Sequence, residues 1–167
     1  MAQDQFRMHD TDRGKPRLRI TKIVVRTVPD EEPDLSWLKT EYDAERHTIT
    51  SSCRCTNDDV KHYGWKKVKQ WIDEDNHRFN THGVTWSCVG VEAVAIIDIL
   101  LEAGPNGFAI CQTVKSGGVW GIENDSDSDY LHEEGENELG QLRDILTALG
   151  VEQVEIDNAL KGAKWEQ

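Results

Sequence analysis

The sequence has no apolar run long enough to cross a lipid bilayer. Its longest one extends from Val94 to Leu101 and is interrupted by Asp98, whereas a membrane-spanning helix needs about 20 consecutive apolar residues. The first seven residues, Met-Ala-Gln-Asp-Gln-Phe-Arg, also lack the apolar stretch of a secretory signal. We therefore expect a cytoplasmic protein whose four cysteines remain reduced thiols.

The sequence also lacks the local signatures of common catalytic and metal sites. Cys53 and Cys55 are spaced C-x-C rather than C-x₂₋₄-C and no second pair follows, which argues against structural zinc. Cys88 and Cys111 fall on expected strands and are predicted to be buried thiols. Without a Gly-x-Ser-x-Gly elbow or a phosphate-binding glycine loop, we expect no catalytic residue and no cofactor. This pattern favours a non-enzymatic function.

Positive charge is scarce in the second half of the chain. Residues 84–167 contain sixteen acids against four bases, which accounts for the whole net charge of −12, because residues 1–83 are balanced. Residues 123–138, the acidic run, contain eight acids and no lysine or arginine. These acids are Glu123, Asp125, Asp127, Asp129, Glu133, Glu134, Glu136 and Glu138.

This charge distribution constrains the partners. A net charge of −12 opposes direct binding to nucleic acid or to anionic membranes and favours basic partners. Residues 1–28 are the exception, because they contain seven bases and three acids. We expect residues 1–16 to be a flexible basic tail that leads into an edge strand protected by cations. The alternative is a basic arm that folds against the acidic half.

Hydrophobic periodicity predicts a single α+β domain over residues 17–167, with a small antiparallel sheet of three to four strands packed against two long helices. The expected strands are 17–28, 47–52, 85–101 and 108–115. The expected helices are 57–81, which Gly64 can divide, 128–149, and a short one at 157–161. A helix over 91–103 competes with the third strand, but its valine and isoleucine content favours a strand.

The acidic run has three possible roles. Asp125, Asp127, Asp129 and Glu136 match oxygen-ligand positions of an EF-hand loop, although Tyr130 replaces the required glycine, so they are only weak metal candidates. Acids are also favoured at the start of a helix, by about 0.3–1 kcal/mol each. Glu138 falls beside the apolar stripe of the expected helix, where a carboxylate needs a cation.

The third possible role of the acidic run is a binding surface. Four glutamates between 133 and 138 occupy about 7.5 Å of helix axis, or roughly one charge per 2 Å. Duplex DNA carries one charge per about 1.7 Å. The solvated helix start and the binding surface remain equally open at this point.

One stretch resembles a known signature. Residues 116–127 read Ser-Gly-Gly-Val-Trp-Gly-Ile-Glu-Asn-Asp-Ser-Asp, which is similar to the Gly-Gly-Leu-Trp-Gly-Ile-Glu-Ser-Asp-Ser motif of an uncharacterised family of small acidic proteins from phages and mobile elements. Residues 34–38, Asp-Leu-Ser-Trp-Leu, resemble that family's Asp-Leu-Ser-Tyr-Leu. The resemblance covers about residues 20–150 and departs from the family at Trp37, Val119 and Asn124.

The resemblance implies a biological setting rather than a mechanism, because the family has no assigned activity. Within the motif, Trp120 with Gly117, Gly118 and Gly121 is expected to be a structural anchor that fixes a backbone turn beside the acidic run. Trp120 as a core residue is favoured over Trp120 as a contact residue.

These observations lead to one preferred function and two alternatives. We expect a phage or mobile-element accessory protein whose acidic run occupies a basic, nucleic-acid-binding surface of a host protein, as DNA-mimicking anti-CRISPR or anti-restriction inhibitors do. All eight acids are candidate contacts. The alternatives are a phage structural or assembly protein, which can form a homodimer, and a protein that binds a divalent metal through the carboxylates of residues 125–136.

Overall fold

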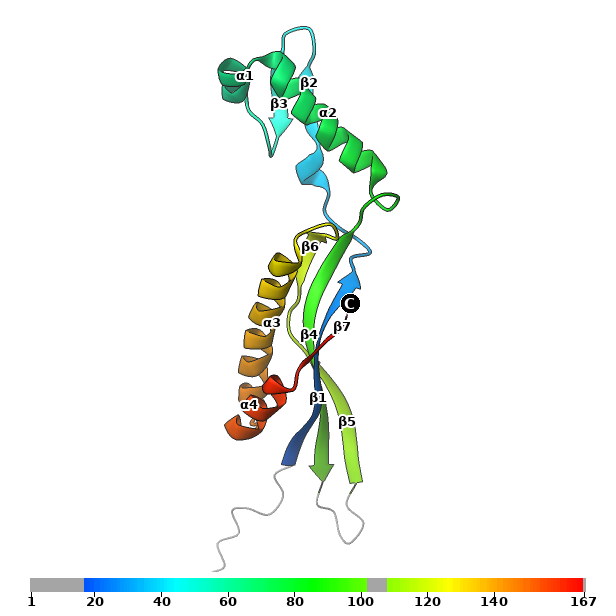
Figure 1. Cartoon of the computed structure of the whole chain (residues 1–167), viewed down its shortest axis with the longest axis vertical. Coiled ribbons are helices and arrows are strands. Elements are labelled where there is room, and N and C mark those ends of the chain that lie inside the picture. Colours follow the sequence, from blue (N-terminus) through cyan, green and yellow to red (C-terminus); the bar gives the residue numbers. More distant parts are fainter. Residues whose placement is uncertain (1–16, 102–107, 167) are drawn as a thin grey trace, which may run out of the picture. The chain divides into compact units, whose positions relative to one another are not determined.

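The computed structural model describes residues 17–101 and 108–166, which form an α+β fold (Figure 1). The described residues divide into two compact units. The sheet unit comprises residues 17–26, 91–118 and 132–166, and the hairpin unit comprises residues 27–90 and 119–131. Each unit therefore combines segments that are distant in the sequence.

The larger sheet has five strands in the order β5-β4-β1-β7, with β6 also paired to β4. Its strands are β1 (Arg17–Pro29), β4 (Cys88–Leu101), β5 (Phe108–Lys115), β6 (Val119–Glu123) and β7 (Lys164–Glu166). β4 and β5 are antiparallel without a register shift from Val94↔Lys115 to Leu101↔Phe108. β1 and β7 are parallel at Val24↔Lys164.

Two helices complete the sheet unit, α3 (Ser128–Ala148) and α4 (Gln153–Lys161). Figure 1 shows α3 lying along the strands. Residues 91–95 of β4 are all buried, so both faces of the strand are covered over this stretch. The buried side chains of this unit include Val91, Ala93, Ala95 and Ile97 of β4, Leu139, Leu142 and Leu146 of α3, and Ile156 of α4.

The hairpin unit contains a small sheet and two helices. β2 (Thr40–Asp43) and β3 (Thr48–Ser52) are antiparallel and follow a 3₁₀ turn, η1 (Ser36–Leu38). α1 (Asn57–Tyr63) begins at a capping box between Thr56 and Asp59. Gly64, at φ 82°, separates it from α2 (Trp65–Thr81). Two clusters of buried residues lie in this unit: Ile49, Cys55, Val68 and Ile72, and Leu38, Trp86 and Cys88.

The predicted fold class is confirmed, whereas the finer architecture is wrong in two respects. The sheet is mixed and five-stranded with a separate two-stranded sheet, and the described residues contain four α-helices. β7 was missed because it has three residues and pairs with a strand from the other end of the chain. A local pattern cannot indicate such a pairing.

Other expectations have mixed outcomes. The strand at 88–101 and the division at Gly64 are confirmed. Cys88 is buried as predicted, whereas Cys111 is exposed because β5 lies at the end of the sheet. β1 lies between β4 and β7 and is not the expected edge strand. The expected tail, residues 1–16, lies outside the described residues. No helix in the described ranges is long and apolar enough to span a membrane.

Candidate functional site

The acidic run is divided between the two units. Glu123, Asp125, Asp127 and Asp129 belong to the hairpin unit, and the four glutamates from 133 to 138 belong to the sheet unit. Each group is therefore described in its own surroundings.

The first two acids of the run form ion pairs with one arginine of α2. Arg78 Nη2 lies 2.7 Å from Glu123 Oε2 and 3.3 Å from Asp125 Oδ1. The guanidinium also stacks on Trp86 at 4.5 Å from the ring centroid, and Trp86 Nε1 donates to the Arg78 carbonyl at 2.7 Å. Glu123 and Asp125 are therefore compensated within the hairpin unit, which weakens both as contacts for a partner.

The next two acids lie at the start of α3. One carboxylate oxygen of Asp127 accepts the backbone N–H of Asp129 at 3.0 Å. This bond satisfies a donor of the first helical turn, as a helix cap does. Asp129 is exposed and favourably placed relative to the helix dipole. Asp127 thus has a structural role, while the carboxylate of Asp129 points to solvent.

Glu138 is not a surface residue, so its prediction as a partner contact is wrong. Its side chain is buried, with 2% of the residue exposed. One carboxylate oxygen accepts the N–H of Gly118 and the other accepts the side-chain amide of Gln141, both at 2.8 Å. Glu138 therefore fastens the turn after β5 to α3, and these donors replace the cation that its position implied.

The other three glutamates remain at the surface of α3. Glu133 and Glu136 are exposed, and Glu134 is half-buried and accepts a bond from Asn137 at 3.4 Å. Glu136 lies 3.9 Å from His132. Within the described residues, no lysine or arginine forms an ion pair with any of the three. This segment is the uncompensated part of the acidic run.

The predicted structural anchor is only partly correct. Trp120 is 49% exposed and so is not a core residue. Its ring lies against the backbone of Gly90, where an added Cβ would come within 2.3 Å of the ring. Gly118 and Gly121 have φ of 74° and 77°, which other residues rarely adopt. Gly121 N–H donates to Asp30 at 3.1 Å. An added Cβ at Gly117 would meet Gln141 at 3.4 Å.

The metal-site alternative receives no support from the geometry. Asp125 already pairs with Arg78, and Asp127 caps α3. Across residues 17–101 and 108–166, no group of three histidine, cysteine or acidic side chains is arranged to hold a metal ion.

The cations of β1 pair with acids outside the run. Arg19 Nη2 lies 2.7 Å from Asp98, and Lys22 Nζ lies 2.8 Å from Glu166. Arg26 Nη2 lies 2.6 Å from Glu92. Together with Glu123, these are all the acids on the strands of the five-stranded sheet, and each has a cationic partner. The described part of the opening segment therefore does not neutralise the acidic run.

Two buried acids have shifted pKa values of opposite sign. Burial raises the pKa of Asp75, and Arg54 at 3.1 Å only partly offsets this effect. Burial alone would also raise the pKa of Glu92. Hydrogen bonds from Arg26 and Lys115 outweigh burial, however, and lower its pKa. Asp75 was missed from the sequence, although its position three residues after Ile72 puts it on the buried face of α2.

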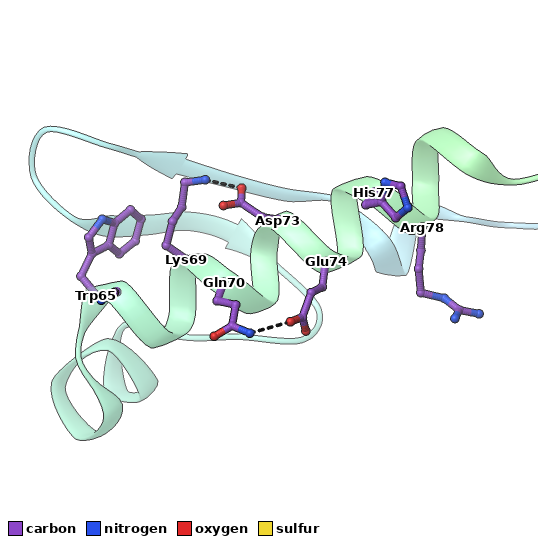
Figure 2. A pocket seen from close by; sticks show the side chains of 8 residues that line it. Trp65, Lys69, Gln70, Asp73, Glu74, His77 and Arg78 are labelled. Atoms are coloured by element: carbon purple, nitrogen blue, oxygen red, sulfur yellow. Dashed lines mark hydrogen bonds and ion pairs between the residues drawn. The ribbon is translucent and has the colours of Figure 1, made fainter.

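A hollow of about 800 Å³ lies along α2, and Figure 2 shows side chains that line it. Lys69 pairs with Asp73, and Gln70 donates to Glu74 at 2.8 Å, one helical turn further on. Such pairs are typical of a solvated helix face. The lining contains no cysteine or serine. The lining residues are Trp65, Lys66, Lys69, Gln70, Asp73, Glu74, His77 and Arg78.

A second hollow, of about 410 Å³, lies in the sheet unit among α3, α4 and β7. Glu136 lines it together with Arg143 and Lys161, and Arg143 donates to Asp157 at 3.0 Å. The half-exposed ring of Trp165 forms another part of its lining. Glu136 therefore shares this hollow with two cations, whereas Glu133 is not among its lining residues.

No protein-family model matches the chain, no curated protein matches its sequence, and no solved structure matches its fold.

Proposed function

We propose that the protein is a non-enzymatic binding protein whose exposed acids at the start of α3 contact a basic surface of another protein. The observation that carries the proposal is a contrast in charge pairing. Every acid on the strands of the five-stranded sheet has an arginine or lysine partner. By comparison, Asp129, Glu133 and Glu136 are exposed and form no ion pair with lysine or arginine in the described residues.

The chemistry of these residues defines the partner. Carboxylates in this number repel one another and favour association with a dense array of cations. Surfaces that bind nucleic acid provide such an array because they match the phosphate backbone. We therefore propose a basic, nucleic-acid-binding host protein as the partner and competition with nucleic acid as the mode of action.

The sequence resemblance supplies the setting of this proposal. The Gly-Gly-Val-Trp-Gly-Ile-Glu stretch of residues 117–123 resembles the motif of small acidic phage and mobile-element proteins. In that setting a DNA mimic would protect the incoming element from host defence, as anti-CRISPR and anti-restriction proteins do. The setting rests on the motif alone, whereas the binding mode rests on the exposed carboxylates.

The proposal is tested with a charge-reversed variant. Asp129→Lys, Glu133→Lys and Glu136→Lys are combined, and Asp127 is left intact because it caps α3. Immobilised wild-type protein should retain a basic protein from bacterial lysate at low salt and release it as salt rises, because screening weakens exposed charge pairs. The triple variant should retain about 100-fold less of it or none.

The matched control carries the same change in net charge at another place. Glu31→Lys, Glu32→Lys and Glu45→Lys replace three exposed acids of the hairpin unit outside the run. This control should capture the partner nearly as well as the wild type. Equal loss in both variants would mean that net charge alone drives capture, and equal retention in both would refute the acidic contact.

A further inference from the structure

β5, at one end of the strand order of the large sheet, has the properties of a strand to which another strand can pair. β5 pairs with β4 on one side, and no described strand pairs with its other side. Natural edge strands are usually short, charged, bulged or interrupted by proline, since an open row of backbone donors and acceptors invites another strand. β5 has eight residues, Phe-Ala-Ile-Cys-Gln-Thr-Val-Lys, and its only charge is at the last position.

The other edge of the same sheet is protected in the usual way. β7 has three residues, and two of them are charged. Glu166 of β7 also pairs with Lys22 at 2.8 Å. The sheet therefore has one protected edge and one open edge, and association between copies through β5 and β7 in a head-to-tail chain is disfavoured.

The direction of the free backbone groups follows from two hydrogen bonds. Ser116 N–H donates to the Ala93 carbonyl at 2.9 Å, so residue 116 faces β4. The Ile96 carbonyl accepts a bond from Thr21 of β1, so residue 96 and its partner Thr113 do not bond each other. Antiparallel pairs alternate in this respect. The backbone groups of Ala109, Cys111, Thr113 and Lys115 therefore face the open edge.

Burial is consistent with an open edge. Residues 109–113 are all exposed, and this includes both faces of the strand. The β4–β5 ladder is regular over eight residue pairs without a bulge that would twist the edge away. The strand is thus exposed from 109 to 113 and uncharged from 108 to 114.

We propose that β5 is a homodimer interface, in which β5 of a second copy pairs with it in antiparallel orientation and the two sheets join into one. An antiparallel pair of identical strands has two-fold symmetry, so both open edges are used and the assembly closes as a dimer. The uncharged segment also lets two chains of net charge −12 meet where repulsion is least. This interface is independent of the acidic run.

Backbone direction restricts the register of the dimer. Residues that face the edge must pair with residues that face the edge, so the two-fold axis passes beside Cys111 or Gln112. The register centred on Cys111 forms about six interchain backbone hydrogen bonds, and the one centred on Gln112 forms about eight. In the register centred on Cys111, the Cα atoms of the two Cys111 residues lie about 5.5 Å apart. In the register centred on Gln112, the two Cys111 residues are diagonal neighbours about 8 Å apart.

Two variants of the full chain test the interface by sedimentation across a dilution series. Thr113→Pro removes an N–H that faces the open edge and keeps the β4 ladder, whereas Thr113→Val keeps the N–H and serves as its control. The wild type and the valine variant should be dimers, and the proline variant should dissociate at least about tenfold more readily. Cys111→Lys should also give a monomer, because like charges would lie opposite each other.

Cross-linking gives a second measurement. In Cys53→Ser protein, Cys111 is the exposed thiol among the described residues, and a short bismaleimide should join two copies at this position. Each of the following results would overturn the proposal: a monomeric wild type at high concentration, a dimer unchanged by both Thr113→Pro and Cys111→Lys, or an open-ended assembly. A monomer whose amides at 109, 111 and 113 resist exchange would instead assign the edge to a segment of the same chain.

Discussion

The buried carboxyl group of Asp75 contributes to the pH response of the hairpin unit. Its pKa is raised because burial outweighs the attraction of Arg54. A raised folded-state pKa means that the contribution of Asp75 to stability is present below its unfolded value of 3.8 and is lost as the pH rises through the folded value. Ionised Asp75 therefore costs stability at neutral pH.

Asp75→Asn should consequently be at least as stable as the wild type at pH 7. As the pH falls toward about 4, the free energy of unfolding of the wild type should rise relative to that of the variant, because Asp75 takes up the proton that the folded state favours. Denaturant unfolding of both proteins at several pH values measures the difference between their free energies of unfolding. The contributions of the other titrating groups are common to both proteins and cancel in this difference. A variant that loses more than about 1 kcal/mol at pH 7 would show that the Arg54 pair dominates instead.

Glu138 is expected to be a stability residue rather than a binding residue. Glu138→Ala leaves the Gly118 N–H and the Gln141 amide without their acceptor, which should cost about 2 kcal/mol of unfolding free energy. Glu133→Ala is the matched control on the same helix and should change stability by less than about 0.5 kcal/mol. Equal values for both variants, measured by chemical denaturation, would contradict the buried role.

The sequence predicts some of these residue roles but not the contacts that produce them. Periodicity placed Glu138 beside an apolar stripe and so indicated that its carboxylate needed a partner. It did not identify that partner as a backbone N–H of Gly118, because that contact joins residues 20 apart through a turn. Likewise, nothing local connects Arg78 with Glu123, which is 45 residues away.

At the level of elements, Glu92 joins three neighbouring strands. It lies on β4 and accepts hydrogen bonds from Arg26 of β1 and Lys115 of β5. Because its pKa is lowered, the stability from these bonds is present above its ordinary value of 4.5 and is lost as the pH falls through the folded value.

Glu92→Gln should lose about 2 kcal/mol of unfolding free energy at pH 7, since charged hydrogen bonds to two cations become neutral ones. The gap between wild type and variant should narrow as the pH falls below about 4.5. Thermal or chemical unfolding at pH 7 and at acidic pH measures both effects. A gap that stays constant over this range would exclude ionisation of Glu92 as its source.

Two glycines of α3 provide an internal test of how β7 is held. An added Cβ at Gly135 would come within 2.3 Å of the Trp165 ring and 2.8 Å of Val25 Cγ1, whereas Gly140 has nothing within 4 Å. Gly140→Ala should stabilise the protein by about 1 kcal/mol through helix propensity. Gly135→Ala gains the same propensity but should lose about 1–3 kcal/mol from overpacking, so it is neutral or destabilising and alters Trp165 fluorescence. Equal stabilisation by both substitutions would contradict the packing of β7 against α3.

Element types were more predictable than their pairing. The long strands and α3 have clear periods of two and 3.6 residues, and the structure confirms them at 88–101, 108–115 and 128–148. β7 and the mixed character of the sheet depend on contact between the two ends of the described chain. No local pattern contains that information, so the sheet was predicted too small and purely antiparallel.

At the scale of the whole molecule, charge is distributed by two rules. Each acid on the strands of the large sheet is matched by a cation, from a neighbouring strand in Arg19–Asp98 and Lys22–Glu166 and from α2 in Arg78–Glu123. Acids at the surface of α3 are not matched in the described residues, and Glu133 is the clearest case. The matched acids hold elements of the fold together, and we propose that the unmatched ones contact a basic partner.

The claim that these carboxylates occupy a nucleic-acid-binding surface is tested most directly by competition. The partner is captured on the immobilised protein at low salt, and duplex DNA, duplex RNA or a neutral polymer is then added at fixed ionic strength. Nucleic acid should release the partner and the neutral polymer should not, because nucleic acid and the acidic protein require the same cations of the partner. A complex that stays intact, or that binds nucleic acid and the acidic protein together, would contradict the account.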